Sequence, residues 1–177
     1  MENRILFAGF GGQGVLSMGM LLAYAGMLEG KNVSWLPSYG PEMRGGTANC
    51  SVIISDEPVG SPLVTEPMAL IAMNRPSLER FESTVQPGGI ILVNSSIIDI
   101  QVQRTDVEAY YVGAKELAEK AGSAKASNMV MLGAYLKKTK LVDTESVLES
   151  FIKVFGKDKE RFIPMNREAL RLGMESV

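Results

Sequence analysis

The stretch RILFAGFGGQGVLS, residues 4–17, decides the fold of this chain. It opens with an apolar run over residues 5–8, breaks into residues 9–14, which we call the glycine loop, and continues as an apolar segment from Val15. A short apolar run that ends at glycines predicts a buried strand, and the apolar segment after the loop predicts a helix. This order places unpaired backbone N–H groups at the positive end of the helix, where anions bind.

The glycine loop matches the pattern G-x-G-x-x-G, which is typical of dinucleotide sites when it joins a strand to a helix. Those sites also need an acid at the end of the second strand. Here that strand ends with SWLP at residues 34–37, and Glu29 lies before it. A P-loop requires a Lys-Ser/Thr pair where this chain has VL at residues 15–16. The sequence therefore argues against both kinds of nucleotide site.

Two interpretations of the glycine loop stay open. In the first, it is a tight turn whose glycines let the strand and the helix pack closely. In the second, the backbone N–H groups of Gly11, Gly12, Gln13 and Gly14 form a cradle for a phosphate or another anion, with Gln13 as a neutral hydrogen-bond partner. Four glycines among the six residues of the loop exceed what a simple turn requires, which favours the cradle.

Composition indicates one ordinary globular domain, residues 1–177, with 46% hydrophobic and 21% charged residues. The net charge of −2 does not favour a nucleic-acid partner. No apolar run reaches the roughly 18 residues that a membrane helix needs. The chain enters its first predicted strand at once and leaves no room for a signal peptide. We therefore expect a cytoplasmic protein without nucleic-acid or membrane contacts.

The chain has no histidine and a single cysteine, Cys50. The absence of histidine excludes Ser–His and Cys–His nucleophiles and removes the commonest metal ligand. One cysteine excludes an internal disulfide and any thiolate-bound iron–sulfur cluster held by this chain alone. We expect no catalytic residue and no metal site in this chain, and we expect Cys50 to be a small buried side chain within a strand.

Hydrophobic patterning predicts strands that alternate with helices, followed by a helical C-terminal third. The expected fold is α/β, a single three-layer domain with a mostly parallel or mixed sheet that opens with a βαβ unit of right-handed crossover. Gly19 and Gly26 indicate close packing of the first helix against the sheet. The predicted strands cover residues 4–8, 32–36, 47–55, 68–73, 90–94 and 107–112, and the predicted helices cover 15–29, 77–85, 114–121, 128–138, 144–155 and 166–174.

A second loop, SYGPEMRGG at residues 38–46, follows the second strand. Its proline and glycines exclude regular structure. It is expected at the carboxyl edge of the sheet, near the glycine loop, where ligands of open α/β sheets bind. Arg44 stands between a methionine and glycines, and we expect it to contact a group outside this chain. The alternative is an ion pair with Glu42 that pins the loop.

Together, the motifs GFGGQGV and SYGPEMRGG, followed by TANCSVIIS and by GSP at residues 60–62, resemble the gamma subunit, or fused gamma domain, of the 2-oxoacid:ferredoxin oxidoreductases. The later helix with Asn128 and LGA at residues 132–134 resembles the same family. The SYGPEMRGG form is more similar to the 2-oxoglutarate and branched-chain 2-oxoacid enzymes than to the pyruvate enzymes. The related indolepyruvate oxidoreductase has a similar subunit, so the substrate stays open.

The resemblance implies a complex that decarboxylates a 2-oxoacid, with 2-oxoglutarate favoured, on thiamine diphosphate. Iron–sulfur clusters then pass electrons to ferredoxin, and the acyl group goes to coenzyme A. These cofactors would lie on partner subunits of the alpha, beta and delta types, and this chain would support assembly without catalysing a step alone. The single cysteine agrees with clusters held elsewhere.

The resemblance also suggests roles for both loops. Gly11, Gly12, Gln13 and Gly14 would hold phosphates of coenzyme A. The interface with the partner subunits would contain Tyr39, Glu42, Arg44, Gly45 and Gly46. Other functions left open are a stand-alone nucleotide-binding module, an independent dinucleotide oxidoreductase and an indolepyruvate oxidoreductase subunit. The isolated chain is also a candidate homodimer.

Overall fold

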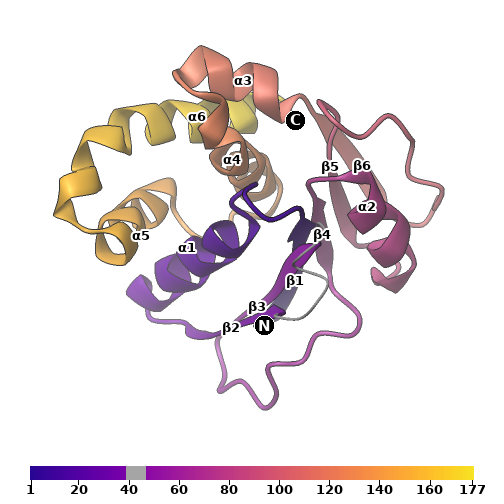
Figure 1. The fold of residues 1–177 in the computed structure, drawn as a ribbon. Coiled ribbons are helices and arrows are strands. Elements are labelled where there is room, and N and C mark those ends of the chain that lie inside the picture. The colour runs from indigo at the N-terminus through magenta and orange to yellow at the C-terminus, as the bar shows by residue number, and fades with distance from the viewer. Residues whose placement is uncertain (39–46) are drawn as a thin grey trace.

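The computed structural model describes residues 1–38 and 47–177. Within them, one sheet has the strand order β2-β3-β1-β4-β5-β6, and helices cover it (Figure 1). The strands are β1 (Glu2–Gly9), β2 (Asn32–Ser38), β3 (Ala48–Ser55), β4 (Ala69–Ala72), β5 (Ile90–Asn94) and β6 (Glu108–Val112). The α-helices are α1 (Val15–Leu28), α2 (Arg75–Phe81), α3 (Ala114–Ala121), α4 (Ser127–Thr139), α5 (Thr144–Phe155) and α6 (Ile163–Glu175). Short 3₁₀ helices are η2 (Glu82–Thr84), η3 (Ala124–Ala126) and η4 (Lys157–Phe162).

The sheet is mixed, as predicted. Strands β1, β4, β5 and β6 run parallel to one another, and β3 is antiparallel to both β1 and β2. β1 and β2 are therefore parallel, as a βαβ unit requires, but β3 lies between them. The sequence predicted the unit without predicting this inserted strand, because strand order depends on pairings between distant residues.

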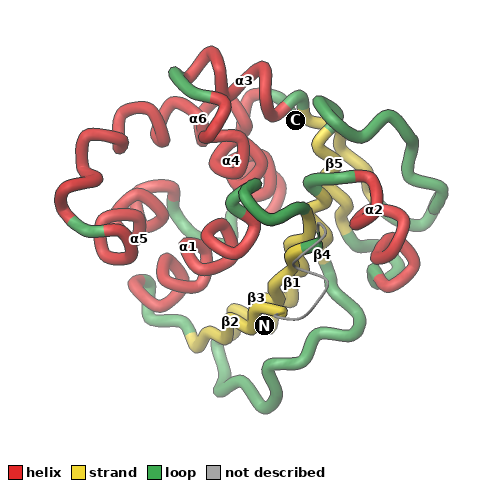
Figure 2. The backbone as a smooth tube through the Cα atoms, viewed as in Figure 1, coloured by secondary structure: helices red, strands yellow, loops and turns green. Residues whose placement is uncertain are grey.

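Helices α1, α3, α4, α5 and α6 gather on one side of the sheet, and α2 lies on the other (Figure 2). On the first side, Phe7 of β1, Val52 of β3 and Ile71 of β4 belong to one core with the helices. On the second side, Leu6, Ala72 and neighbouring strand residues pack under α2 through Leu78. Alternate residues of each strand thus enter opposite cores, which confirms the three-layer fold.

Close packing of α1 on the sheet confirms the expectation for Gly19 and Gly26. A Cβ atom on Gly19 would collide with the Cys50 thiol. A Cβ atom on Gly26 would lie 3.1 Å from Ile54 Cδ1 and from Val33 Cγ1. The helix can approach the sheet this closely only where it lacks side chains.

Helices α2 and α6 begin earlier than predicted, and each has a proline in its first turn; α2 also ends at Phe81 and not at residue 85, since residues 82–84 form η2. α2 begins at Arg75, before Pro76, because Asn74 caps it: the Asn74 Oδ1 atom accepts a hydrogen bond from Ser77 N at 3.0 Å. α6 begins at Ile163 and includes Pro164 in its first turn. Proline fits a first turn because it needs no backbone donor there, so it marks a helix start and not only a break.

The helical C-terminal third is held by the crossing of α4 and α6. A Cβ atom on Gly133 would collide with the backbone of Leu170, and one on Gly173 would collide with the backbone of Val130. The two helix backbones therefore meet directly. Among the described residues, no helix combines the length and the apolar character needed to cross a membrane.

Candidate functional site

The glycine loop leaves β1 at the carboxyl edge of the parallel strands. Ala8 pairs with Ala72 of β4, which pairs in turn with Val93 of β5, so these strands end side by side. Asn94 ends β5, and its side-chain Nδ2 atom donates a hydrogen bond to Met73 O at 3.4 Å. This is the edge at which ligands of α/β sheets commonly bind.

Part of the glycine loop is a structural turn. Gly9 has no room for a side chain, since a Cβ atom would lie 2.6 Å from Gln13 Oε1 and 2.7 Å from Met73 Cβ. The Gln13 side chain ties the turn together: its Oε1 accepts from Phe10 N at 2.6 Å, and its Nε2 donates to Met73 O at 3.1 Å. Both polar atoms of Gln13 are thus used inside the protein, which assigns this side chain to positioning the loop.

The rest of the loop has the geometry of an anion cradle. Gly12 (φ 89°) and Gly14 (φ 72°) have left-handed backbone conformations that favour glycine. A Cβ atom on Gly11 would meet no atom of residues 1–38 or 47–177 within 4 Å, and the φ of Gly11 is not left-handed, so neither packing against these residues nor conformation requires glycine there. An open backbone at Gly11 allows a ligand to approach closely.

Helix α1 begins directly behind this open backbone. Gly14 is its N-cap residue, and no side chain caps the helix. Within residues 1–38 and 47–177, the N–H groups of Gly11, Gly12, Gly14 and the first turn, residues 15–17, have no hydrogen-bond acceptor. Six unpaired donors at a positive helix end are an arrangement that an anion satisfies.

Two hollows open onto this part of the loop. One, of about 340 Å³, is lined by Phe10, the glycine loop, the first turn of α1 and Ala48. The other, of about 300 Å³, shares Gly12 with the first and is lined by Lys115 and Lys125. Among the residues that the structure describes, no carboxylate lines either hollow, so their charge favours an anion.

The second predicted loop lies outside the described residues, but its flanking strands are in place. Ser38, at the end of β2, pairs with Asn49, and Ala48, at the start of β3, pairs with Gly9. The chain therefore leaves and re-enters the sheet at the edge that carries the glycine loop, as expected. The proposed interface residues Tyr39, Glu42, Arg44, Gly45 and Gly46 belong to the segment that is not described, and their role stays a prediction.

Cys50 lies in β3 and is fully buried, as expected. Burial raises the pKa of its thiol to about 12. A thiol with such a pKa remains protonated at neutral pH and is a poor nucleophile. Among the described residues, no three side chains of the His, Cys, Asp or Glu type come close enough together to hold a metal ion.

Sequence reasoning missed the residues that complete the site from the second half of the chain. Lys115 and Lys125 lie at the starts of α3 and η3, about one hundred residues after the glycine loop. Asn128 also reaches the loop, because its side chain donates to Gly14 O at 3.4 Å. Its place in a family-like motif was the available signal.

The fold and this edge define an α/β domain with a glycine loop of unpaired backbone N–H groups at the carboxyl edge of its parallel strands, and without a metal-ligating cluster among its described residues. The family described as pyruvate ferredoxin/flavodoxin oxidoreductase matches residues 4–176. The chain belongs to this family of oxidoreductases, which confirms the resemblance drawn from the two loops.

Individual relatives agree with this assignment. Ketoisovalerate oxidoreductase subunit VorA of Methanothermobacter thermautotrophicus is 48% identical over 98% of this chain. The gamma subunit of a keto/oxoacid ferredoxin oxidoreductase from Geobacter sulfurreducens has the same fold, with a TM-score of 0.84 and 28% identity, over 98% of this chain and 97% of its own. The 2-oxoglutarate:ferredoxin oxidoreductase from Magnetococcus marinus, solved with 2-oxoglutarate, coenzyme A and succinyl-CoA bound, matches 99% of this chain with a TM-score of 0.87 and 25% identity.

This chain covers different fractions of the length of its relatives. The chain spans 36% of the VorA relative and 31% of the Magnetococcus chain. By contrast, it spans nearly all of the Geobacter gamma subunit. This chain thus corresponds to a gamma-type unit, which is a separate subunit in one relative and part of a longer chain in the others.

Proposed function

We propose that this chain works as the gamma component of a heteromeric 2-oxoacid:ferredoxin oxidoreductase. Thiamine diphosphate, the iron–sulfur clusters and the contact with ferredoxin then belong to partner subunits of the alpha, beta and delta types. The absence of histidine and the single buried cysteine support this division of labour. The reaction would be the oxidative decarboxylation of a 2-oxoacid to its acyl-CoA.

The part of the reaction that falls to this chain is the binding of coenzyme A phosphates at the glycine loop. One observation carries this proposal: the unpaired N–H groups of Gly11, Gly12, Gly14 and the first turn of α1, which face a hollow of about 340 Å³, whereas Gln13 N donates to Phe10 O. Backbone donors at a helix start suit a phosphate. Lys115 and Lys125 in the adjoining hollow add positive charge. The coenzyme A in the Magnetococcus relative makes this ligand the first one to test.

The substrate is proposed from the relatives. Sequence motifs favoured 2-oxoglutarate, with branched-chain 2-oxoacids next. The VorA relative, named for ketoisovalerate, is 48% identical, whereas the Magnetococcus 2-oxoglutarate enzyme is 25% identical. This difference favours a branched-chain 2-oxoacid such as ketoisovalerate over 2-oxoglutarate. Reduction of ferredoxin by the complete complex, supplied in turn with each 2-oxoacid and with pyruvate and indolepyruvate, decides among them by kcat/KM.

The coenzyme A proposal is tested with Gly11→Asp in the complete complex. Gly11 accepts a side chain without a clash, so the variant adds a carboxylate among the N–H donors while leaving the fold intact. We expect the KM for coenzyme A to rise about tenfold or more, since two like charges in close contact cost more than about 1.4 kcal/mol away from bulk water. The kcat at saturating coenzyme A should change little.

Gly11→Asn is the matched control, because it has the same shape without the charge. It should keep a KM for coenzyme A within about twofold of the wild-type value. An unchanged KM for coenzyme A in Gly11→Asp would show that the glycine loop is only a structural turn.

Assembly is tested separately, by affinity purification of the tagged chain from its native source. We expect the three partner types to co-purify, and we expect Arg44→Ala to reduce their yield. Recovery of the tagged chain alone would favour a stand-alone nucleotide-binding module. We also propose a cytoplasmic location, supported by the single unpaired cysteine; cell fractionation tests it.

A further inference from the structure

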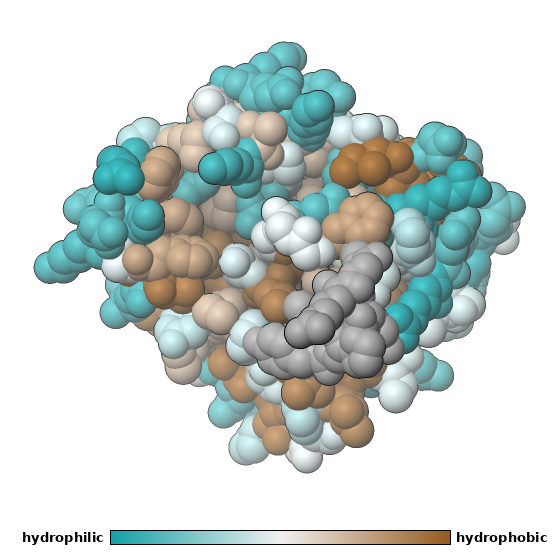
Figure 3. Space-filling model, viewed as in Figure 1, coloured by the Kyte–Doolittle hydropathy of each residue, from teal (hydrophilic) through white to brown (hydrophobic). Residues whose placement is uncertain are grey.

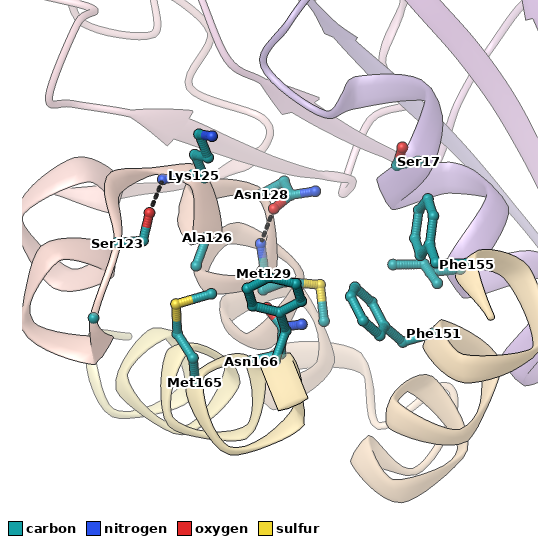
Figure 4. Close-up of a pocket in the computed structure, with 13 residues that line it drawn as sticks. Ser17, Ser123, Lys125, Ala126, Asn128, Met129, Phe151, Phe155, Met165 and Asn166 are labelled. Carbon is teal, nitrogen blue, oxygen red and sulfur yellow. Dashed lines mark hydrogen bonds between the residues drawn. The ribbon is translucent and has the colours of Figure 1, made fainter. Parts of the chain in front are cut away.

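A third and larger pocket, of about 510 Å³, lies among the helices and adjoins the two glycine-loop hollows, since it shares Ser17 with one and Lys125 with the other (Figure 4). Its walls come from α1, from η3 with the start of α4, from α5, and from η4 with the start of α6. This volume is in the range of pockets that bind small organic molecules. We call it the helix pocket.

The floor of the helix pocket is apolar. Phe151 and Phe155 of α5 stack obliquely, with ring centroids 5.0 Å apart and an angle of 53° between the rings. Met129 and Met165 face them from α4 and α6 (Figure 4). Phe155 is 38% exposed, and Figure 3 shows apolar residues gathered over α1 and α5 on this face of the molecule. Aromatic rings and flexible methionines in this arrangement suit a flat or branched apolar body.

One polar side chain lies among these apolar groups. Asn166 of α6 lines the helix pocket and is only 4% exposed. Its side-chain amide makes no hydrogen bond within residues 1–38 and 47–177, and its atoms are not among the fully buried unpartnered polar atoms, so the amide reaches the open space of the pocket. An amide at a pocket wall can both donate a hydrogen bond to a ligand and accept one from it.

Charge at the pocket favours an anion. Of the described residues that line it, none is a carboxylate and one, Lys125, is a cation. In Figure 4, Ser123, Lys125, Asn128 and Ser17 lie along one side, above the apolar floor. Ser17 belongs to the first turn of α1, whose N–H groups are unpaired.

Two more cations lie near Phe162, which also lines the pocket. The Arg161 Cζ atom lies 4.8 Å from the ring centroid of Phe162, and the Lys159 Nζ atom lies 5.8 Å from it. Neither cation lines the pocket, and Asp158 and Glu160 of the same 3₁₀ helix offset their charge, so the positive charge at the pocket itself comes from Lys125.

We propose that the helix pocket binds a small amphipathic organic anion. Its single anionic group lies toward Lys125 and Ser17, its aromatic or branched body rests on Phe151 and Met129, and a polar atom bonds to the amide of Asn166. Its apolar floor lies outside the coenzyme A site proposed at the glycine loop, although the two sites share Ser17 and Lys125, and the proposal does not depend on coenzyme A binding there.

The test uses the full chain and the fluorescent probe 1-anilinonaphthalene-8-sulfonate, which joins an aromatic body to one anionic group. We expect saturable binding with one site per chain. Phe151→Ala, Asn166→Leu and Lys125→Glu should each weaken the probe about tenfold, through loss of the floor, the polar partner and the cation. Lys120→Glu is the matched charge control, because Lys120 is an exposed residue of α3 that does not line the pocket, and it should bind like the wild type.

A neutral probe separates anion binding from simple hydrophobic binding. N-phenyl-1-naphthylamine has the same rings without the sulfonate, and we expect it to bind at least tenfold more weakly and to be insensitive to Lys125→Glu. Equal binding of both probes, with no effect of Lys125→Glu on either, would overturn the preference for an anion. Binding of the sulfonate probe that none of the three pocket variants changes would overturn the site.

Coenzyme A distinguishes this site from the glycine loop. We expect Gly11→Asp to leave the affinity for the sulfonate probe unchanged, and coenzyme A not to displace the probe. Displacement by coenzyme A in the wild type that is lost in Gly11→Asp would overturn the proposal, because the helix pocket would then be part of the coenzyme A site.

Discussion

The side chain of Asn128, at the start of α4, donates a hydrogen bond to the carbonyl oxygen of Gly14 at 3.4 Å, across 114 residues of sequence. The Asn128 side chain also packs tightly against Gly14, because a Cβ atom on Gly14 would lie only 2.5 Å from Asn128 Nδ2. The start of α1 and the end of the glycine loop are thereby held by the helical third of the chain.

This contact predicts that Asn128→Leu loosens the glycine loop without unfolding the protein. The loss of one partly buried hydrogen bond should reduce the free energy of unfolding by about 1 kcal/mol. In the complete complex, the KM for coenzyme A should rise severalfold while kcat is kept, which steady-state kinetics measures. Asn128→Asp is the control for side-chain size: it keeps the shape of asparagine but, like leucine, has no N–H group to donate to Gly14 O. A normal KM in both variants would show that the loop does not depend on Asn128.

The contact between Gly19 and Cys50 makes a second prediction. Gly19→Ala should reduce the free energy of unfolding by about 1–3 kcal/mol, because the new methyl group has no space between α1 and β3. This loss outweighs the gain of about 1 kcal/mol that alanine brings to a helix. Urea unfolding measures it. Gly60→Ala is the control, since a Cβ atom at Gly60 meets nothing within 4 Å.

Removal of the Cys50 sulfur atom tests whether the collision with this thiol causes the loss of stability in Gly19→Ala. In the double variant Gly19→Ala with Cys50→Ala, the new methyl group gains space, so the two losses should not add. We expect a coupling free energy of about 1 kcal/mol or more from the double-mutant cycle. Strict additivity would mean that Gly19→Ala acts through Val52 and Trp35, the other two neighbours.

The buried thiol of Cys50 predicts a loss of stability at alkaline pH. Burial raises its pKa to about 12 in the folded protein, whereas an unfolded thiol has a pKa of about 8.5. The stabilising effect of the proton is therefore fully present below pH 8.5 and is lost as the pH rises toward 12. Between pH 8.5 and 10 the free energy of unfolding should fall by about 1–2 kcal/mol, with a smaller fall in Cys50→Ala. An equal fall in both proteins, measured by urea unfolding, would exclude the thiol as its source.

The amide of Asn166 predicts an effect on ligand binding with little effect on stability. Its atoms are not among the fully buried unpartnered polar atoms, and Asn166→Leu keeps nearly the same volume, so the free energy of unfolding of the ligand-free chain should change by less than about 1 kcal/mol. Thermal unfolding without ligand measures this change. A clearly less stable Asn166→Leu would mean that the amide has a stabilising partner in the folded chain.

Much of the fold could be predicted from the sequence, because apolar runs bounded by glycine and proline define the strands and a regular helical period defines the helices. The bounds predicted for β5, α3 and α5 agree with those observed. Strand order could not be predicted in this way: β3 separates β1 from β2 through pairings that no local pattern reports. The meeting of Gly133 and Gly173 in the crossing of α4 and α6 also depends on residues far apart.

Only the part of the candidate site that belongs to the glycine loop could be predicted from the sequence. The loop, the helix start behind it and the nearness of the second loop follow from local patterns and from the rule for α/β sheet edges. The role of Gln13 within the turn, and the approach of Lys115, Lys125 and Asn128, could not be predicted. They arise where α3 and α4 return over the sheet, and that return is fixed by packing against α1 and α6.

The insertion of β3 between β1 and β2 has a consequence for folding kinetics. β1 forms hydrogen bonds with β3 on one side and with β4 on the other, and both partners come later in the chain. The centre of the sheet can close only after loops of about 40 to 60 residues have been ordered, which slows folding relative to a sheet of sequential hairpins. The antiparallel pair of β2 and β3 has the most local strand contacts of the sheet, which makes it the natural place for folding to begin.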